Sequence, residues 1–97
     1  MAQVEITQEE EGTGWWSFTV RVDGEGRGPA RTLKLAWADY NLWSEDGADP
    51  PHAVARAVVE FLLRRHALDE LPLRIDAAVA RRRFPEADRE IPGLIRK

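Results

Sequence analysis

The sequence predicts an α+β domain, in which a three-stranded antiparallel β-meander packs on one long amphipathic helix, followed by a short second helix and a tail. Two patterns support this prediction. Apolar and polar residues alternate over short segments in the first 40 residues, as in half-buried strands. Beyond residue 50, apolar residues recur at spacings of three and four, as on one face of a helix. We expect the 97 residues to form a single two-layer domain.

Three strands are expected, at residues 3–9, 15–23 and 31–38. The second has the clearest alternation, with apolar residues at the even positions Trp16, Phe18, Val20 and Val22. In the third strand we expect Leu33, Leu35 and Trp37 to face inward. A turn at residues 9–14 and a glycine-rich loop at residues 23–29 join the strands. Short connections between sequential strands favour an antiparallel meander.

A long helix is expected over residues 50–66, the segment PPHAVARAVVEFLLRRH. Asp49 is suited to cap it, and Pro50 and Pro51 fit a first turn whose N–H groups are unpaired in any case. Its predicted buried face consists of Val54, Ala57, Val58, Phe61 and Leu62. The opposite side carries Arg56, Glu60 and Arg64, which predicts a solvated surface.

The end of the chain predicts smaller elements. A short extended piece at residues 71–76 precedes a second helix, expected at residues 77–83. Asp76 is suited to cap this helix, and Phe84-Pro85 ends it, because proline disfavours helical backbone in the residue before it. Residues 86–97 are expected to form a tail or one last helical turn.

Composition excludes several classes of protein. The chain has no cysteine, which excludes disulfides and thiolate metal sites. Its first residues contain no basic segment followed by an apolar one, so no signal peptide is expected. No apolar run is long enough to cross a bilayer. We therefore expect a cytoplasmic protein without a membrane partner.

The net charge of −3 conceals an asymmetry. Residues 1–49 carry four Lys and Arg against ten Asp and Glu, whereas residues 50–97 carry ten against seven. Opposite charges on the two halves favour docking of the later helices on the strands, or head-to-tail pairing of two copies. The acidic total disfavours nucleic acid as a partner.

Two of the four tryptophans are candidate partner contacts. Trp16 and Trp37 lie on predicted inward faces, where core packing explains them. Trp15 is predicted to point the other way, and Trp43 lies outside any periodic segment. Since exposed aromatic residues mark interaction surfaces, Trp15 and Trp43 are the candidates. The alternative is that a loop or the tail covers both.

The most basic run consists of Arg81, Arg82 and Arg83, next to Phe84. Arginines bind phosphate and aromatic rings stack on bases, so this run is a candidate nucleic-acid contact. The acidic residues that follow it favour a solvated helix face instead.

The sequence contains no catalytic or metal-binding pattern. His52 and His66 lie fourteen residues apart, at opposite ends of one predicted helix, so they cannot share a metal ion within one chain. The carboxylates at residues 9–11 and 45–46 lack the ligand spacing of a calcium loop. We expect no cofactor, no metal and no enzymatic activity. An active site completed at a dimer interface is the remaining alternative.

The second half resembles a family of short, uncharacterised bacterial proteins. Phe61-Leu62-Leu63-Arg64-Arg65, Leu73-Arg74-Ile75-Asp76 and Phe84-Pro85-Glu86-Ala87 carry this resemblance. The motifs concern packing, so the resemblance implies no activity. The order of a meander and then a helix is also similar to HicB-type antitoxins, although the Pro-Asp-Leu-Pro-Gly turn of that family is absent here.

The predicted function is binding. We expect a small interaction or accessory protein that binds another protein or a second copy of itself, because open strand edges are commonly completed by another chain. The second hypothesis is a nucleic-acid-associated or antitoxin-like regulator that uses Arg81–Arg83 as its contact.

Overall fold

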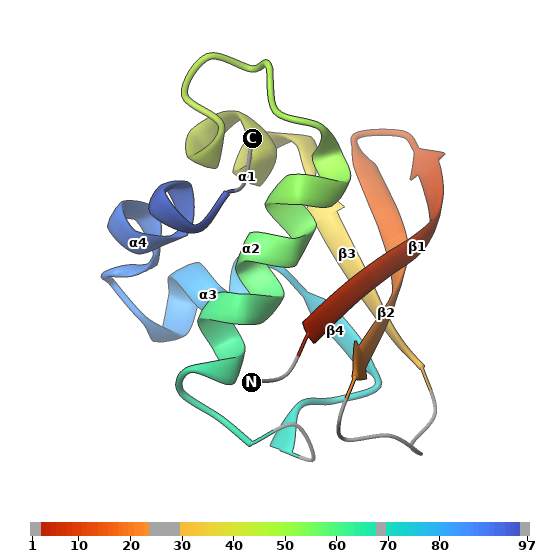
Figure 1. Cartoon of the computed structure of the whole chain (residues 1–97). Helices are drawn as coiled ribbons and strands as arrows, with labels where there is room; N and C mark the ends of the chain where they lie inside the picture. The colour runs from red at the N-terminus through yellow and green to blue at the C-terminus, as the bar shows by residue number, and fades with distance from the viewer. Residues whose placement is uncertain (1–2, 24–29, 68–69, 96–97) are drawn as a thin grey trace.

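A four-stranded mixed sheet is covered on one face by helices (Figure 1). The structure is a computed structural model that describes residues 3–23, 30–67 and 70–95. In chain order the elements are β1 (Gln3–Gly12), β2 (Trp15–Asp23), β3 (Arg31–Ala36), α1 (Trp37–Trp43), α2 (Pro51–Leu63), β4 (Arg74–Asp76), α3 (Ala78–Arg83) and α4 (Ala87–Leu94). The predicted α+β class is confirmed.

The sheet has the order β1-β2-β3-β4. The first three strands form the predicted antiparallel meander, but the prediction of a three-stranded sheet is wrong. The extended piece near residue 74 becomes β4, which pairs parallel to β3 with Ile75 opposite Leu33. A parallel partner must cross over, and here the chain does so through α1 and α2.

Strand β1 continues past residue 9, where the sequence predicted a turn, and a β-bulge lies within it. Thr7 is opposite Thr19 and Glu10 is opposite Ser17, so β1 has one extra residue between these pairs. Gln8 has a φ of 51°, in the left-handed region that a bulge of this kind uses. The bulge reverses the alternation of β1, which hides the second half of the strand from a period-two pattern.

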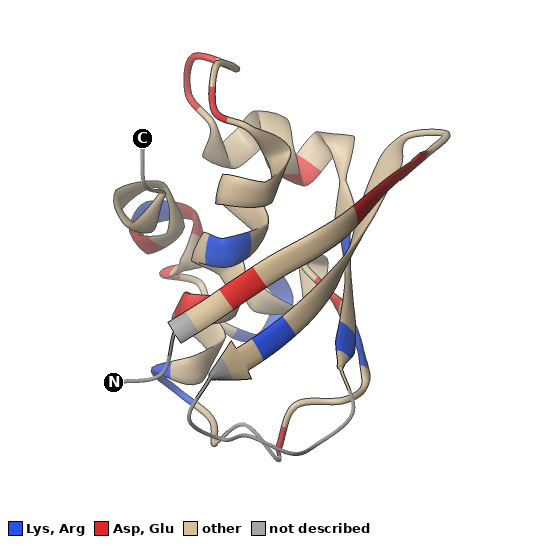
Figure 2. Cartoon of the chain, turned by 45° about the vertical axis from the view of Figure 1, so that its right-hand side comes forward, with Lys and Arg blue, Asp and Glu red and all other residues tan. Residues whose placement is uncertain are grey.

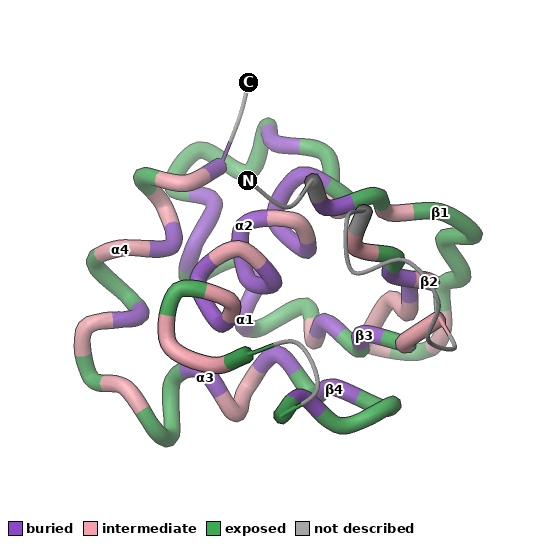
Figure 3. Tube along the Cα trace, turned by 60° about the horizontal axis from the view of Figure 1, so that its bottom comes forward, coloured by how far each residue is buried: buried purple, intermediate pink, exposed green. Residues whose placement is uncertain are grey.

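Helix α2 is the central element of the core (Figure 3). All five residues of the predicted apolar stripe are buried, and so are Ala53, Ala55 and Val59. The helix contacts both the sheet and α4. More of its surface is therefore buried than in a two-layer fold, where a helix packs on the sheet alone. Asp49 does not cap it, because its carboxylate accepts a hydrogen bond from Ser44 Oγ at 2.7 Å.

Two helices replace segments that were predicted otherwise. The third strand ends at Ala36, where the chain turns into α1, and the Trp37 N–H donates to the Gly14 carbonyl at 2.9 Å. Trp37 is 41% exposed and does not belong to the core, contrary to the predicted inward face. The predicted tail forms α4, which buries Ala87 and Ile91 one helical turn apart.

The second predicted helix is confirmed as α3, which ends at Arg83, just before Phe84-Pro85. Asp76 is not the N-cap, contrary to the prediction, because Ala77 occupies that position. The Asp76 carboxylate still accepts a hydrogen bond from the Ala78 N–H, at 3.0 Å. Within the described ranges, no helix is both long enough and apolar enough to cross a membrane.

Candidate functional site: the open edge of strand β4

Trp43 is not a surface residue, so its predicted role as a partner contact is wrong. The side chain is fully buried at the end of α1, and its indole N–H donates to Asp88 Oδ1 at 2.9 Å. Helix α4, which covers it, approaches from 45 residues further along the chain, so the residues next to Trp43 do not indicate its burial.

The Arg81 side chain, on α3, forms ion pairs with residues of α1 and α4. Its guanidinium contacts Asp39 of α1 at 3.3 Å and Asp88 of α4 at 3.0 Å. The hydrogen bond to Asp88 is the largest cause that raises the pKa of Arg81. Arg82 and Arg83 are exposed and form no ion pair with the residues that the structure describes. The arginine run therefore does not present three free cations to a phosphate backbone.

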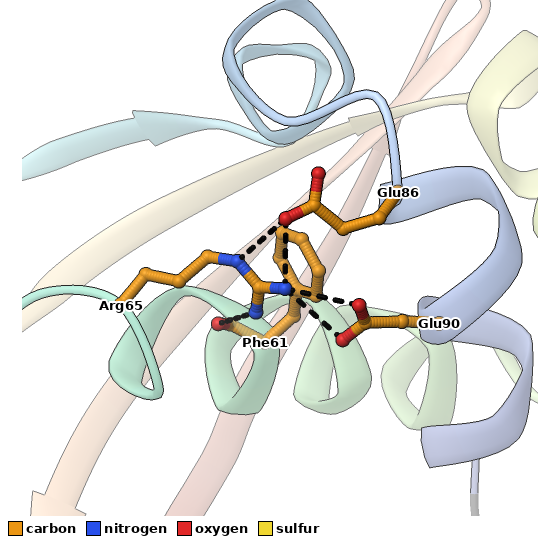
Figure 4. Close-up of polar contacts among 4 residues, drawn as sticks. All are labelled: Phe61, Arg65, Glu86 and Glu90. Carbon is orange, nitrogen blue, oxygen red and sulfur yellow. Dashed lines mark hydrogen bonds and ion pairs between the residues drawn. The ribbon is translucent and has the colours of Figure 1, made fainter.

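A second arginine fastens α4 to α2 (Figure 4). Arg65 Nη2 lies 3.1 Å from both Glu86 and Glu90, and the guanidinium carbon lies 3.8 Å from the centre of the Phe61 ring. Desolvation opposes the charge of Arg65, but the hydrogen bonds to Glu90 and Glu86 outweigh it and raise its pKa. The cluster is a structural clamp.

Trp15 lies on the face of the sheet that the helices leave open. It is opposite Gly12, and a Cβ atom at Gly12 would meet the Trp15 ring at 2.3 Å, so the ring lies directly over this glycine. Lys34 Nζ lies 5.5 Å from the centre of the same ring, within cation–π range. The predicted orientation of Trp15 is therefore confirmed, and the side chain is half-buried.

Two hollows flank β4, one on each face of the sheet. The outer hollow has a volume of about 400 Å³ and is lined by Trp15, Ser17, Thr32, Lys34, Arg74, Ile75 and Asp76. The inner hollow lies on the helix side, also has a volume of about 400 Å³, and is more enclosed. It is lined by Leu62, His66, Glu70, Leu71, Pro72, Arg74, Ile75, Asp76, Val79 and Arg83.

The backbone between the two hollows is an unpaired strand edge. The Leu73 carbonyl accepts from Thr32 at 2.8 Å and the Ala77 N–H donates to Lys34 at 2.9 Å, so the odd-numbered residues of this segment face β3. Backbone groups alternate in direction along a strand, so the N–H and C=O of Arg74 and Asp76 point away from β3. No other strand in the described part of the chain lies beyond β4.

Among the residues that the structure describes, the surroundings of this edge are partly apolar and carry more cations than anions. Figure 3 shows β4 at the periphery of the trace, and Leu73, just before it, is 54% exposed. Lys34, Arg74 and Arg83 line the hollows without an ion pair among the described residues. The carboxylates there are Glu70 and Asp76. An extended chain could therefore find hydrogen-bonding groups, apolar contacts and cations together.

The histidines remain separate, as the sequence predicts. His52 is exposed in the first turn of α2, whereas His66 contacts the Phe84 ring, 5.7 Å between centres, and lies 3.8 Å from Glu70. Among the residues placed by the structure, no three His, Cys, Asp or Glu side chains gather as a metal site would need.

The sequence did not indicate Lys34, Arg74 or Ile75 as site residues. The apolar–polar alternation in residues 71–76 was the available signal, since it predicted an extended piece. The pairing of this piece with β3, which creates the edge and both hollows, depends on a contact about 40 residues away in the chain.

Comparisons with protein-family models, with curated proteins and with solved structures found no match for this chain. The resemblance of its second half to short bacterial proteins stays a prediction.

Proposed function

We propose that this chain is a protein-interaction protein that binds an extended segment of a partner protein along the β4 edge, and that it acts by binding rather than catalysis. The observation that carries the proposal is the outward direction of the Arg74 and Asp76 backbone groups between two hollows. An added strand pairs its main chain with such an edge and places alternate side chains on the two faces of the sheet.

The hydrogen bonds alone are too few for a stable complex. The two outward residues of β4 offer at most four backbone groups, and each hydrogen bond contributes about 0.5–1.5 kcal/mol net. Burial of one apolar side chain contributes about 1.5–3 kcal/mol more. Ordering the partner offsets part of this sum, so we expect affinities of about micromolar or weaker. The inner hollow is where such a side chain would be buried.

A pair of variants at one position tests this proposal. Arg74→Pro removes the outward N–H and leaves the N–H groups that bond to β3 in place, whereas Arg74→Ala removes only the side chain. Peptides of about ten random residues, displayed on phage, are selected on the wild-type chain, and the enriched peptides are then titrated against both variants. We expect Arg74→Pro to weaken binding at least about tenfold relative to Arg74→Ala, because backbone pairing is lost.

Amide spectra confirm that each variant is folded before the titration. Equal binding by the two folded variants, or a selection that yields no binding peptide, would overturn the proposal. A third outcome is that the wild-type chain self-associates and that Arg74→Pro abolishes this self-association. The β4 edge would then bind a second copy of the chain and not a partner protein, which would also overturn the proposal.

A further inference from the structure

We infer that the segment bound at the β4 edge carries an acidic residue directly next to an apolar one. The acidic side chain lies on the outer face beside Arg74, with Lys34 on the neighbouring strand β3, and the apolar side chain enters the inner hollow. This inference rests on the proposed function, and it specifies the chemistry of the partner.

The outer side favours a carboxylate. Lys34 and Arg74 both line the outer hollow, and neither forms an ion pair with the residues described. Lys34 is held near the Trp15 ring at 5.5 Å. Its neighbour on β2 is Ser17, a hydroxyl donor opposite Lys34 in the register. Two cations and a hydroxyl beside an aromatic wall suit a carboxylate better than an apolar group.

Among the described residues, Asp76 is the acidic one that lines the outer hollow, and it limits where a carboxylate can lie. It is opposite Lys34, whereas Arg74 is opposite Thr32. A carboxylate on the added strand therefore avoids repulsion when it lies beside Arg74, at the start of β4, and meets Asp76 when it lies at the end.

The inner side favours an apolar residue. Leu62, Leu71 and Val79 line the inner hollow, and the buried Ile75 lies between the two outward-facing residues of β4. Side chains of an added strand alternate between the two faces, so the residue beside Ile75 faces the inner hollow when the residue beside Arg74 faces outward. Adjacent acidic and apolar residues in the partner therefore match this edge.

Charge reversal tests the inference. The phage peptides selected on the wild-type chain are sequenced, and synthetic versions are titrated against Lys34→Glu and against Arg82→Glu. Arg82 is exposed and lines neither hollow, so its reversal changes the net charge equally without changing the site. We expect Asp or Glu next to Leu, Ile, Val or Phe to be enriched, and Lys34→Glu to weaken binding about three- to tenfold more than Arg82→Glu.

A peptide whose acidic residue is replaced by lysine completes the test. It should bind Lys34→Glu more tightly than the wild-type chain, because the reversed pair is restored. Peptides that need the backbone edge but show no acidic preference, or that respond equally to both reversals, would overturn this inference and leave strand addition at β4 intact. Loss of strand addition itself is detected separately, by equal binding of the Arg74→Pro and Arg74→Ala variants.

Discussion

Trp43 connects three parts of the helical layer through one side chain. Its ring is fully buried and its indole N–H bonds to Asp88, which also accepts from Arg81 at 3.0 Å. Asp39, the other acceptor of Arg81, is itself buried. A buried aromatic ring and a carboxylate shared between two donors thus fix the position of α4 against α1.

Substitution of Trp43 is expected to destabilise the whole domain. Trp43→Ala should lower the free energy of unfolding by about 3–5 kcal/mol through the cavity that it leaves. Trp43→Phe retains most of the ring and loses the hydrogen bond, and this lost bond should lower that free energy by about 1 kcal/mol. Urea unfolding followed by circular dichroism measures both changes.

Trp37→Phe is the matched control, because Trp37 is 41% exposed. Its effect should stay within about 0.5 kcal/mol. An equal effect of Trp37→Phe and Trp43→Phe would contradict the assignment of Trp43 to the core.

At the scale of elements, α4 depends on an electrostatic clamp as well as on burial. The Glu86 carboxylate accepts a hydrogen bond from the Glu86 backbone N–H, and this bond is the largest cause that lowers the pKa of Glu86. The contacts with Arg65 lower this pKa further. A carboxyl group whose pKa is lower in the folded state stabilises that state above its unfolded pKa, and the stabilisation is lost as pH falls through the folded pKa.

We therefore expect the docking of α4 to weaken in acid. The melting temperature of the wild-type chain should fall below about pH 4.3, the ordinary pKa of glutamate, more steeply than that of Glu86→Gln. Thermal melts in a pH series measure the difference. Glu45→Gln, at an exposed loop residue with no ion pair among the described residues, should follow the wild-type curve. Parallel curves for all three proteins would contradict the role of Glu86.

Helices and strands with a clear hydrophobic period in their own sequence could be predicted. Those that form only through contacts with residues far away in the chain could not. β2 and α2 have clear periods of two and about 3.6 residues, so their positions are close to the predicted ones. α1 was missed because two patterns overlap at Trp37. Leu35 and Trp37 continue the alternation of a strand, whereas Trp37, Tyr40 and Trp43 recur every three residues, as in a helix. Tertiary contacts decided between these patterns.

The candidate site shows the same limit. Trp15 was identified because alternation alone gives the outward direction of its side chain. The β4 edge was missed because three residues are too few for a periodic signal, and its partner strand precedes it by two helices. The orientation of Trp15 is thus predictable from one strand, whereas an edge is a property of the assembled sheet.

At the scale of the whole molecule, the charge asymmetry has a limited role. Among the described residues, the Arg81–Asp39 pair joins the two halves, while the pairs of Arg65, of His66 with Glu70, and of Arg81 with Asp88 lie within the second half. The buried apolar residues of α2 also hold the halves together. Figure 2 shows acidic segments in the part of β1 near the hairpin and in the loop after α1.

This distribution predicts weak binding to nucleic acid. Affinity for a phosphate backbone grows with the number of cations that contact it, and each contact is weakened by salt. Arg65 and Arg81 are engaged with carboxylates, which leaves Arg82 and Arg83 as the exposed cations of the α3 run. We expect labelled single- and double-stranded oligonucleotides to show no binding at micromolar protein in low salt, measured by fluorescence anisotropy.

Binding in that assay would favour the nucleic-acid hypothesis only if it depends on the run. The double variant Arg82→Glu and Arg83→Glu would then have to abolish it, while Arg21→Glu, at an exposed position on β2, changes it little. Because Arg83 also lines the inner hollow, the double variant could alter the β4 edge as well, whereas Arg82 lines neither hollow. Loss of oligonucleotide binding with unchanged peptide binding in Arg82→Glu alone would separate a nucleic-acid surface on α3 from the protein-binding edge.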